Sequence, residues 1–180
     1  FRRVLFRSDE PVIDWRAYLR RFNGMAFKVF TKKTRRKPNK RFYGNPALKI
    51  KQRKSTLVAV DTSGSVGKDD LREFLSEIHH IWKTGTEVTV VECDAHIGRV
   101  YEYTGTIEDA KEVTGRGGTS YEPVMQYLWD HKDKFQNLIY LTDGECSIEK
   151  TEPCKPTLWV HCSGRSVNEN LPGAKVQINS

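Results

Sequence analysis

No apolar run in the sequence approaches the roughly 18 residues that a membrane-spanning helix needs. Cysteine is scarce, with four in 180 residues, and no two of them form a CxxC pair. These absences exclude a chain anchored by a transmembrane helix, a disulfide scaffold and a zinc ribbon. We therefore expect a cytoplasmic protein with free thiols. The four cysteines are Cys93, Cys146, Cys154 and Cys162.

The size and composition are those of one ordinary domain, or of one domain with an appendage. The chain has a mass of 20.8 kDa, and its residues are 37% hydrophobic and 29% charged. This balance can bury a sizeable core and still cover it with a charged surface.

The first eight residues, FRRVLFRS, are expected to be foreign to the protein. The DNA string TTC AGA CGT GTG CTC TTC CGA TCT translates to these residues and resembles the end of a common sequencing adapter. Residues 1–8 are therefore interpreted as an assembly scar, which contributes three arginines to the charge. We expect the natural protein to continue upstream, so that this chain is the C-terminal part of a longer one.

Acidic residues are absent from residues 24–55, which contain twelve lysines and arginines. The full chain has a net charge of +7, whereas the residues outside 1–8 and 24–55 have a net charge of −8. The sequence thus describes a mildly acidic body with a basic arm. Pro38, Gly44 and Pro46 interrupt the arm, and we expect an extended segment with a short hairpin between Ala26–Thr31 and Lys40–Tyr43.

Three roles are open for the basic arm: solvated charge, binding to nucleic acid or to an acidic partner, and a structural wrap around the body. Its aromatic residues could stack on bases or fasten the arm to the sheet. We favour the wrap, because the arm runs directly into the first predicted core strand. The aromatic residues concerned are Phe27, Phe30, Phe42 and Tyr43.

Strands and helices alternate along the rest of the chain. Short apolar runs predict strands, and apolar residues at helical spacing predict helices. This order indicates a doubly wound α/β fold with a mostly parallel sheet flanked by helices, preceded by an N-terminal helix and the basic arm. Strands are predicted at Thr56–Val60, Glu87–Glu92, Gly98–Tyr103, Leu138–Thr142, Thr157–His161 and Lys175–Ile178, and helices at Ile13–Phe22, Asp69–Lys83 and Tyr121–His131.

Polar segments follow two of the predicted strands and precede one helix. Residues 61–65 read DTSGS, residues 115–120 read GRGGTS, and Asp143 follows the strand ending at Thr142. In a doubly wound fold, such ends converge on one crevice. Carboxylates and hydroxyls are hard oxygen ligands that suit Mg²⁺, Mn²⁺ or Ca²⁺. Taken alone, DTSGS could also be a turn that caps the following helix.

The segments DTSGS, GGTS and LTDG, in this order, resemble the metal-ion-dependent adhesion site of a von Willebrand factor type A (VWA) domain. The resemblance implies a Rossmann-like fold and a site for Mg²⁺, or for Mn²⁺ or Ca²⁺. It implies that Ser63 and Ser65 bind the metal directly and Thr119 directly or through water. Asp61 and Asp143 would hold bound waters and supply charge.

A second resemblance covers about residues 11–180. The segments DWRAYLRRF, TRRKPNKRFYG, VDTSGSV, VECDA, GRGGTSYEPV, LTDG and LWV resemble the VWA-like C-terminal domain of a bacterial family of metallopeptidase-like proteins. Members of that family carry a zinc-protease-type motif upstream and often accompany MoxR-type AAA+ ATPases. This chain has no HExxH motif, so we expect any protease activity to lie outside it.

The ligand set favours binding over catalysis. Two carboxylates cannot fill six coordination positions, so one face of the metal stays open to a carboxylate from an Asp or Glu of a protein partner. We therefore expect a non-catalytic, metal-dependent interaction module at residues 56–180, with residues 9–55 as helix and arm. A nucleic-acid-binding adaptor that uses the arm is the alternative.

Other chemistries lack a necessary residue. A subtilisin-like serine hydrolase could use Asp61 and Ser120, but no histidine stands in the required motif. A haloacid-dehalogenase-type phosphatase needs a second aspartate at the position of Ser63. The spacing of Cys146, Cys154 and Cys162 beside His161 is not a standard zinc pattern.

Overall fold

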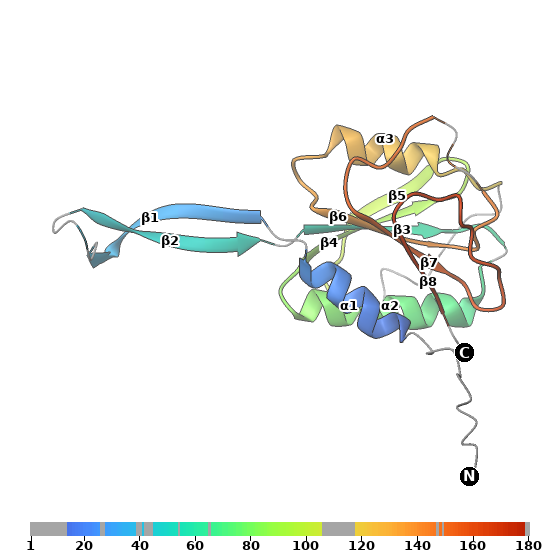
Figure 1. Cartoon of the computed structure of the whole chain (residues 1–180), viewed down its shortest axis with the longest axis horizontal. Helices are drawn as coiled ribbons and strands as arrows, with labels where there is room; N and C mark the ends of the chain where they lie inside the picture. The colour runs from blue at the N-terminus through green and yellow to red at the C-terminus, as the bar shows by residue number, and fades with distance from the viewer. Residues whose placement is uncertain are drawn as a thin grey trace, which may run out of the picture.

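A six-stranded sheet with helices on both faces forms the body of the chain in a computed structural model (Figure 1). The structure describes residues 14–25, 28–38, 41, 45–53, 55–64, 66–105, 118–146, 148 and 150–178. The helices are α1 (Trp15–Met25), α2 (Lys68–Lys83) and α3 (Glu122–Asp130). The strands are β1 (Lys28–Pro38), β2 (Pro46–Arg53), β3 (Ser55–Asp61), β4 (Glu87–Cys93), β5 (Ile97–Glu102), β6 (Asn137–Thr142), β7 (Thr157–His161) and β8 (Ala174–Gln177).

The strand order of the sheet is β5-β4-β3-β6-β7-β8. All neighbours are parallel except β4 and β5, which pair antiparallel. From β3 the chain turns first to β4 on one side and later to β6 on the other. The point between β3 and β6 is therefore the topological switch point, where ligands bind in such folds. The predicted doubly wound, mostly parallel α/β fold is confirmed.

The two faces of the sheet bury separate apolar clusters, as strand alternation requires. Val58 and Val60 of β3 lie on the face that α2 covers, together with Phe74 and Ile78. Leu57 and Ala59, and with them Met125 of α3, lie on the other face. Strands buried on both faces read as the unbroken apolar runs seen in the sequence. None of the described helices is long and apolar enough to cross a membrane.

Helix α1 is part of this core. The segments after β6 and β7 run over the α3 face, where Ile148 and Leu171 join the cluster. Among the described residues, no crossover helix lies on the opposite face of β7 and β8, and α1 covers this face, alongside α2 (Figure 1). Trp15 and Leu19, which are 2% and 0% exposed, pack there in one cluster with Val160 of β7.

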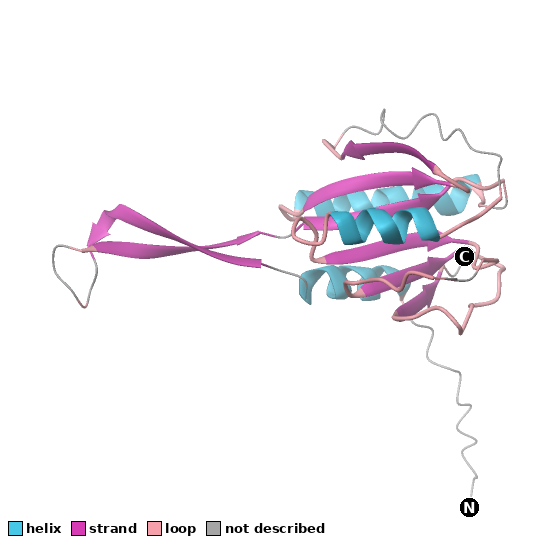
Figure 2. Ribbon diagram, turned by 90° about the horizontal axis from the view of Figure 1, so that it is seen from above, coloured by secondary structure: helices cyan, strands magenta, loops and turns pink. Residues whose placement is uncertain are grey.

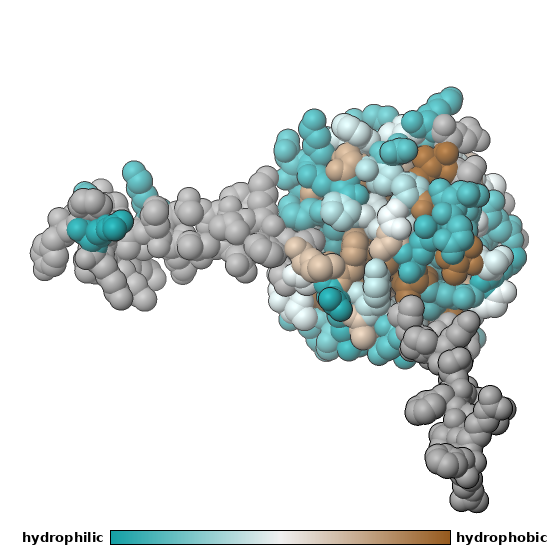
Figure 3. Space-filling model, viewed as in Figure 1, coloured by the Kyte–Doolittle hydropathy of each residue, from teal (hydrophilic) through white to brown (hydrophobic). Residues whose placement is uncertain are grey.

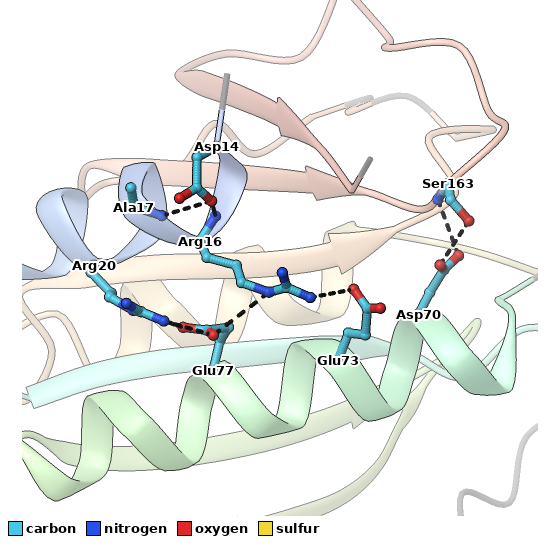
Figure 4. Close-up of polar contacts among 8 residues, drawn as sticks. All are labelled: Asp14, Arg16, Ala17, Arg20, Asp70, Glu73, Glu77 and Ser163. Carbon is cyan, nitrogen blue, oxygen red and sulfur yellow. Dashed lines mark hydrogen bonds and ion pairs between the residues drawn. The ribbon is translucent and has the colours of Figure 1, made fainter. Parts of the chain in front are cut away.

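Ion pairs join α1 to α2, and a capping aspartate begins α1 (Figure 4). The Asp14 carboxylate accepts hydrogen bonds from the backbone N–H groups of Arg16 and Ala17, so Asp14 caps the helix as its sequence position suggests. The Arg20 guanidinium donates two hydrogen bonds of 2.8 Å to Glu77 of α2. This bidentate geometry also orients α1 relative to α2.

The basic arm forms a long antiparallel hairpin that extends away from the sheet (Figure 2). The predicted wrap around the body is therefore wrong for the described backbone of β1 and β2, because this backbone runs away from the sheet (Figures 1 and 2). The return strand is Pro46–Arg53, not Lys40–Tyr43, because apolar residues alternate at Leu48 and Ile50, opposite Lys33 and Thr31. Most of Lys40–Tyr43 and the aromatic residues Phe27, Phe42 and Tyr43 lie outside the described residues, as do the side chain of Phe30 and residues 1–8.

Candidate metal centre

Asp61 ends β3 at the switch point and is 1% exposed. Its Oδ1 accepts a hydrogen bond of 2.9 Å from the backbone N–H of Ser63, and the Ser63 side chain hydrogen-bonds to the same carboxylate. The aspartate and the serine N–H that it binds are two residues apart because the chain turns directly after the strand. The DTSGS segment thus folds back on its own aspartate.

The second oxygen of Asp61 is held from the neighbouring strand. Thr142, the last residue of β6, donates from Oγ1 to Asp61 Oδ2 at 3.3 Å. The Thr142 hydroxyl has one proton, so it must accept the 2.7 Å hydrogen bond that joins it to Tyr121 Oη. It also accepts from the Gly144 N–H at 3.1 Å. A chain of donors therefore runs from Tyr121 through Thr142 to Asp61.

Asp143 follows β6 and is 2% exposed. Burial raises the pKa of Asp61, and the nearby charge of Asp143 raises it further, while hydrogen bonds from Ser63 and Thr142 act in the opposite direction. Asp143 Oδ1 also accepts a hydrogen bond from the Glu145 N–H. The carboxyl ends of β3 and β6 thus bring two buried carboxylates close enough to repel each other.

The other predicted ligands lie at the same edge or outside the described residues. Ser63 is 8% exposed and lies two residues after the end of β3. Thr119 is half-buried and lies just before α3, next to Ser120, whose N–H donates to the carbonyl of Asp94 beyond β4. Since Cys93 pairs with Asp61 in the sheet, this contact keeps the Thr119 backbone near the switch point. Ser65 lies outside the described residues.

The donors present fit a hard cation. Two buried carboxylates repel each other, and no lysine, arginine or histidine forms an ion pair with Asp61 in the described part of the chain. Among the described residues, no group of three or more His, Cys, Asp or Glu side chains is arranged so that it could hold a metal ion. Carboxylates supplemented by hydroxyls therefore remain as the donor set, which suits Mg²⁺, Mn²⁺ or Ca²⁺ and not zinc.

Three residues to which the sequence assigned no role also belong to this region: Tyr121, Thr142 and His161. His161 ends β7 beside Thr142 and is fully buried, and no described group hydrogen-bonds to either of its ring nitrogens. Burial lowers the pKa of His161 and nearby Lys175 lowers it further, against the raising effect of Asp143. A neutral imidazole therefore stands close to the Asp143 carboxylate.

The described side chains around the site offer no activated nucleophile. Burial and the charges of Asp94 and Asp61 raise the pKa of the Cys93 thiol to about 12, so it stays protonated at neutral pH. No histidine hydrogen-bonds to Ser120 in the part of the chain that the structure describes; His79, for example, lies on α2 and contacts Tyr103 Oη. The subtilisin-like arrangement of Asp61 and Ser120 thus has no base in this region.

Comparisons with known proteins agree with this architecture. An uncharacterized protein of Thermotoga maritima is 28% identical over 148 residues, which are 82% of this chain and 37% of the relative. The crystal structure of the ArnB paralog VWA2 from Sulfolobus acidocaldarius shares the fold, with a TM-score of 0.52 and 17% identity. That match covers 86% of this chain and 51% of the solved one. The chain thus spans about a third to a half of the length of these relatives.

The family comparison covers the whole sheet. The model of the VWA-like domain (DUF2201) matches residues 56–178, from the second residue of β3 to the end of the described chain. This match, the strand order and the position of the polar loops lead to one assignment: the chain belongs to the VWA-like domain family DUF2201.

Proposed function

We propose that this chain is a metal-ion-dependent protein-interaction module, with Mg²⁺, or alternatively Mn²⁺ or Ca²⁺, at the carboxyl ends of β3 and β6. One observation carries the proposal: Asp61 and Asp143 are both buried there, and the charge of Asp143 raises the pKa of Asp61. A bound cation would compensate this repulsion. VWA-like domains are typically interaction modules, which agrees with the absence of an activated nucleophile among the described residues.

Each residue of the site has a distinct role in this proposal. Ser63 and Ser65 would supply hydroxyl ligands, and Thr119 a third oxygen from the loop before α3. Asp61 and Asp143 would supply negative charge and orient bound water. When bound, the cation supplies positive charge at an open position, which an Asp or Glu carboxylate of a protein partner could fill.

We further propose that the partner is a MoxR-type AAA+ ATPase, and that the chain works as the interaction end of a longer metallopeptidase-like protein in the cytoplasm. The resemblance of the motifs to the bacterial metallopeptidase-like family supports a MoxR-type partner. The 37% coverage of the Thermotoga maritima relative is compatible with a longer protein. The four free thiols are compatible with a reducing compartment.

Capture of a purified MoxR-type ATPase on the immobilised chain tests the proposal. We expect capture in Mg²⁺ and release by EDTA, because the partner carboxylate would bind through the cation. Thr119→Ala should weaken capture roughly tenfold while leaving the melting temperature unchanged, since half-buried Thr119 supplies an oxygen and little packing.

The control is Thr151→Ala, because Thr151 is another half-buried threonine, and its hydroxyl donates to Glu122 and not to a residue of the site. It should leave capture unchanged. Capture that persists in EDTA would show that the ATPase binds through another surface and would contradict the proposal.

A further inference from the structure

The β1–β2 hairpin is a basic element whose two strands pair with each other along their length. Its 11-residue strand β1 reaches about 35 Å, and the paired strands extend away from the sheet (Figures 1 and 2). The two strands together contain nine lysines and arginines and no acidic residue. Its coloured surface is hydrophilic (Figure 3), and the described side chains Lys33 and Arg41 are exposed.

The register of the hairpin places like charges opposite each other. Lys28 pairs with Arg53, and Lys32 pairs with Lys49. Like charges directly opposite in an antiparallel pair are destabilising, and a two-stranded hairpin alone is marginal in water. This arrangement of charges works against the stability of the hairpin itself. It is the arrangement expected of a surface that binds a polyanion.

Protection of exposed strand edges explains only part of this charge. Lysines on an edge strand prevent pairing with other chains. A few scattered charges are enough to prevent such pairing. Edge protection does not require cations opposite each other, nor the absence of every acidic residue from 24–55. It would also be compatible with acidic residues elsewhere in the hairpin. The excess charge therefore indicates a ligand.

We propose that the hairpin binds double-stranded DNA through the sugar–phosphate backbone. A two-stranded β-ribbon has the width that the major groove of B-form DNA, about 12 Å, admits. The major groove of A-form RNA is deep and narrow, so the same ribbon does not enter it. Contacts between cations and phosphates would make the binding independent of sequence and strongly dependent on salt.

The DNA-binding element and the metal centre lie at opposite ends of the sheet. The hairpin leads into the first residue of β3, whereas Asp61 is the last residue of that strand, about 20 Å away. DNA on the hairpin thus leaves the carboxyl ends of β3 and β6 accessible. The chain could hold DNA and a metal-dependent protein partner together, and failure of one activity would not imply failure of the other.

Anisotropy of a labelled 20-base-pair DNA duplex, titrated with the whole chain between 50 and 200 mM salt, tests the proposal. The informative variant is Lys28→Glu with Lys32→Glu, because each glutamate would stand opposite a cation in the register. Affinity should fall roughly tenfold or more, and the slope of log affinity against log salt should decrease by about two. The melting temperature should stay equal or rise.

The matched control is Lys83→Glu with Lys132→Glu, which makes the same change in net charge at two exposed positions of the body. It should weaken binding less than about threefold. Equal losses in the two double variants would mean that the hairpin has no special role, and absence of binding at 50 mM salt would refute the proposal. Tighter binding of an RNA duplex, or equal competition by poly-glutamate, would assign the hairpin to a different ligand and contradict it.

Discussion

At the scale of single residues, the Thr142 hydroxyl connects the two strands of the candidate metal centre. It donates to Asp61 and accepts from Tyr121 and Gly144, so all its hydrogen-bonding capacity is used. Burial raises the pKa of Tyr121 well above its usual range, which keeps its hydroxyl protonated as the first donor of this chain. The orientation of Asp61 therefore depends on a residue that is not itself a predicted ligand.

Thr142→Val removes this hydroxyl and retains the branched shape. The free energy of unfolding should fall by about 1–3 kcal/mol, because buried donors and an acceptor lose their partner. Mn²⁺ affinity should fall roughly tenfold or more, as expected when a group that orients a ligand is lost. Denaturation in urea and a Mn²⁺ titration measure the two effects.

Two further variants separate orientation from packing. Thr142→Ser, which keeps the hydroxyl, should retain most of the Mn²⁺ affinity. Thr89→Val, a change at a buried threonine of β4, should leave Mn²⁺ affinity unaltered. A Thr142→Val variant that binds Mn²⁺ as tightly as the original chain would show that Thr142 does not position Asp61.

The ligand candidates could be predicted from sequence because each belongs to a short motif next to a strand or helix. Asp61 and Ser63 follow the apolar run of β3, and Asp143 follows that of β6. His161 could not be predicted in the same way, since its proximity to the site depends on the pairing of β6 with β7. Such adjacency is a property of the fold and leaves no local pattern.

At the scale of elements, helix α1 completes the core although it precedes the family-matched region 56–178. Leu19 is fully buried, and Asn23 hydrogen-bonds to the side chains of Thr56 and Thr86. The helix could be predicted from its apolar spacing, but its place could not. That place follows from the connections after β6 and β7, which both lie on the other face.

Leu19→Ala should lower the free energy of unfolding by about 2–5 kcal/mol, the usual effect of a cavity in a packed core. Arg21→Ala, at an exposed position of the same helix, is the control and should change it by less than about 0.5 kcal/mol. Urea denaturation measures both. Similar values for the two variants would mean that α1 does not contribute to the core.

The hairpin shows where the charge pattern misleads a sequence-based prediction. Because the basic segment runs directly into the first core strand, it was interpreted as an arm that wraps around the body, with a short hairpin that returns at Lys40–Tyr43. The structure instead pairs Thr31 with Ile50 and Lys33 with Leu48. A hairpin with a connection as long as 39–45 lacks the short turn signal that fixes register in sequence.

At the scale of the whole molecule, the parallel sheet determines where both proposed ligands bind. Unbroken apolar runs predicted its strands, and the alternation of strands and helices predicted its class. The order β5-β4-β3-β6-β7-β8 then places Asp61 and Asp143 at the switch point and the hairpin at the other end of β3. A protein partner and DNA would thus meet separate surfaces of one rigid sheet.

The central claim is that Asp61 and Asp143 hold one divalent cation, and electron paramagnetic resonance of added Mn²⁺ tests it most directly. The signal of free Mn²⁺ should decrease by one equivalent per chain, and Mg²⁺ should restore it. Asp61→Ala and Asp143→Ala should each abolish the decrease, whereas Asp130→Ala, at an exposed position of α3, should leave it intact. One bound Mn²⁺ that remains in both Asp61→Ala and Asp143→Ala would contradict the account.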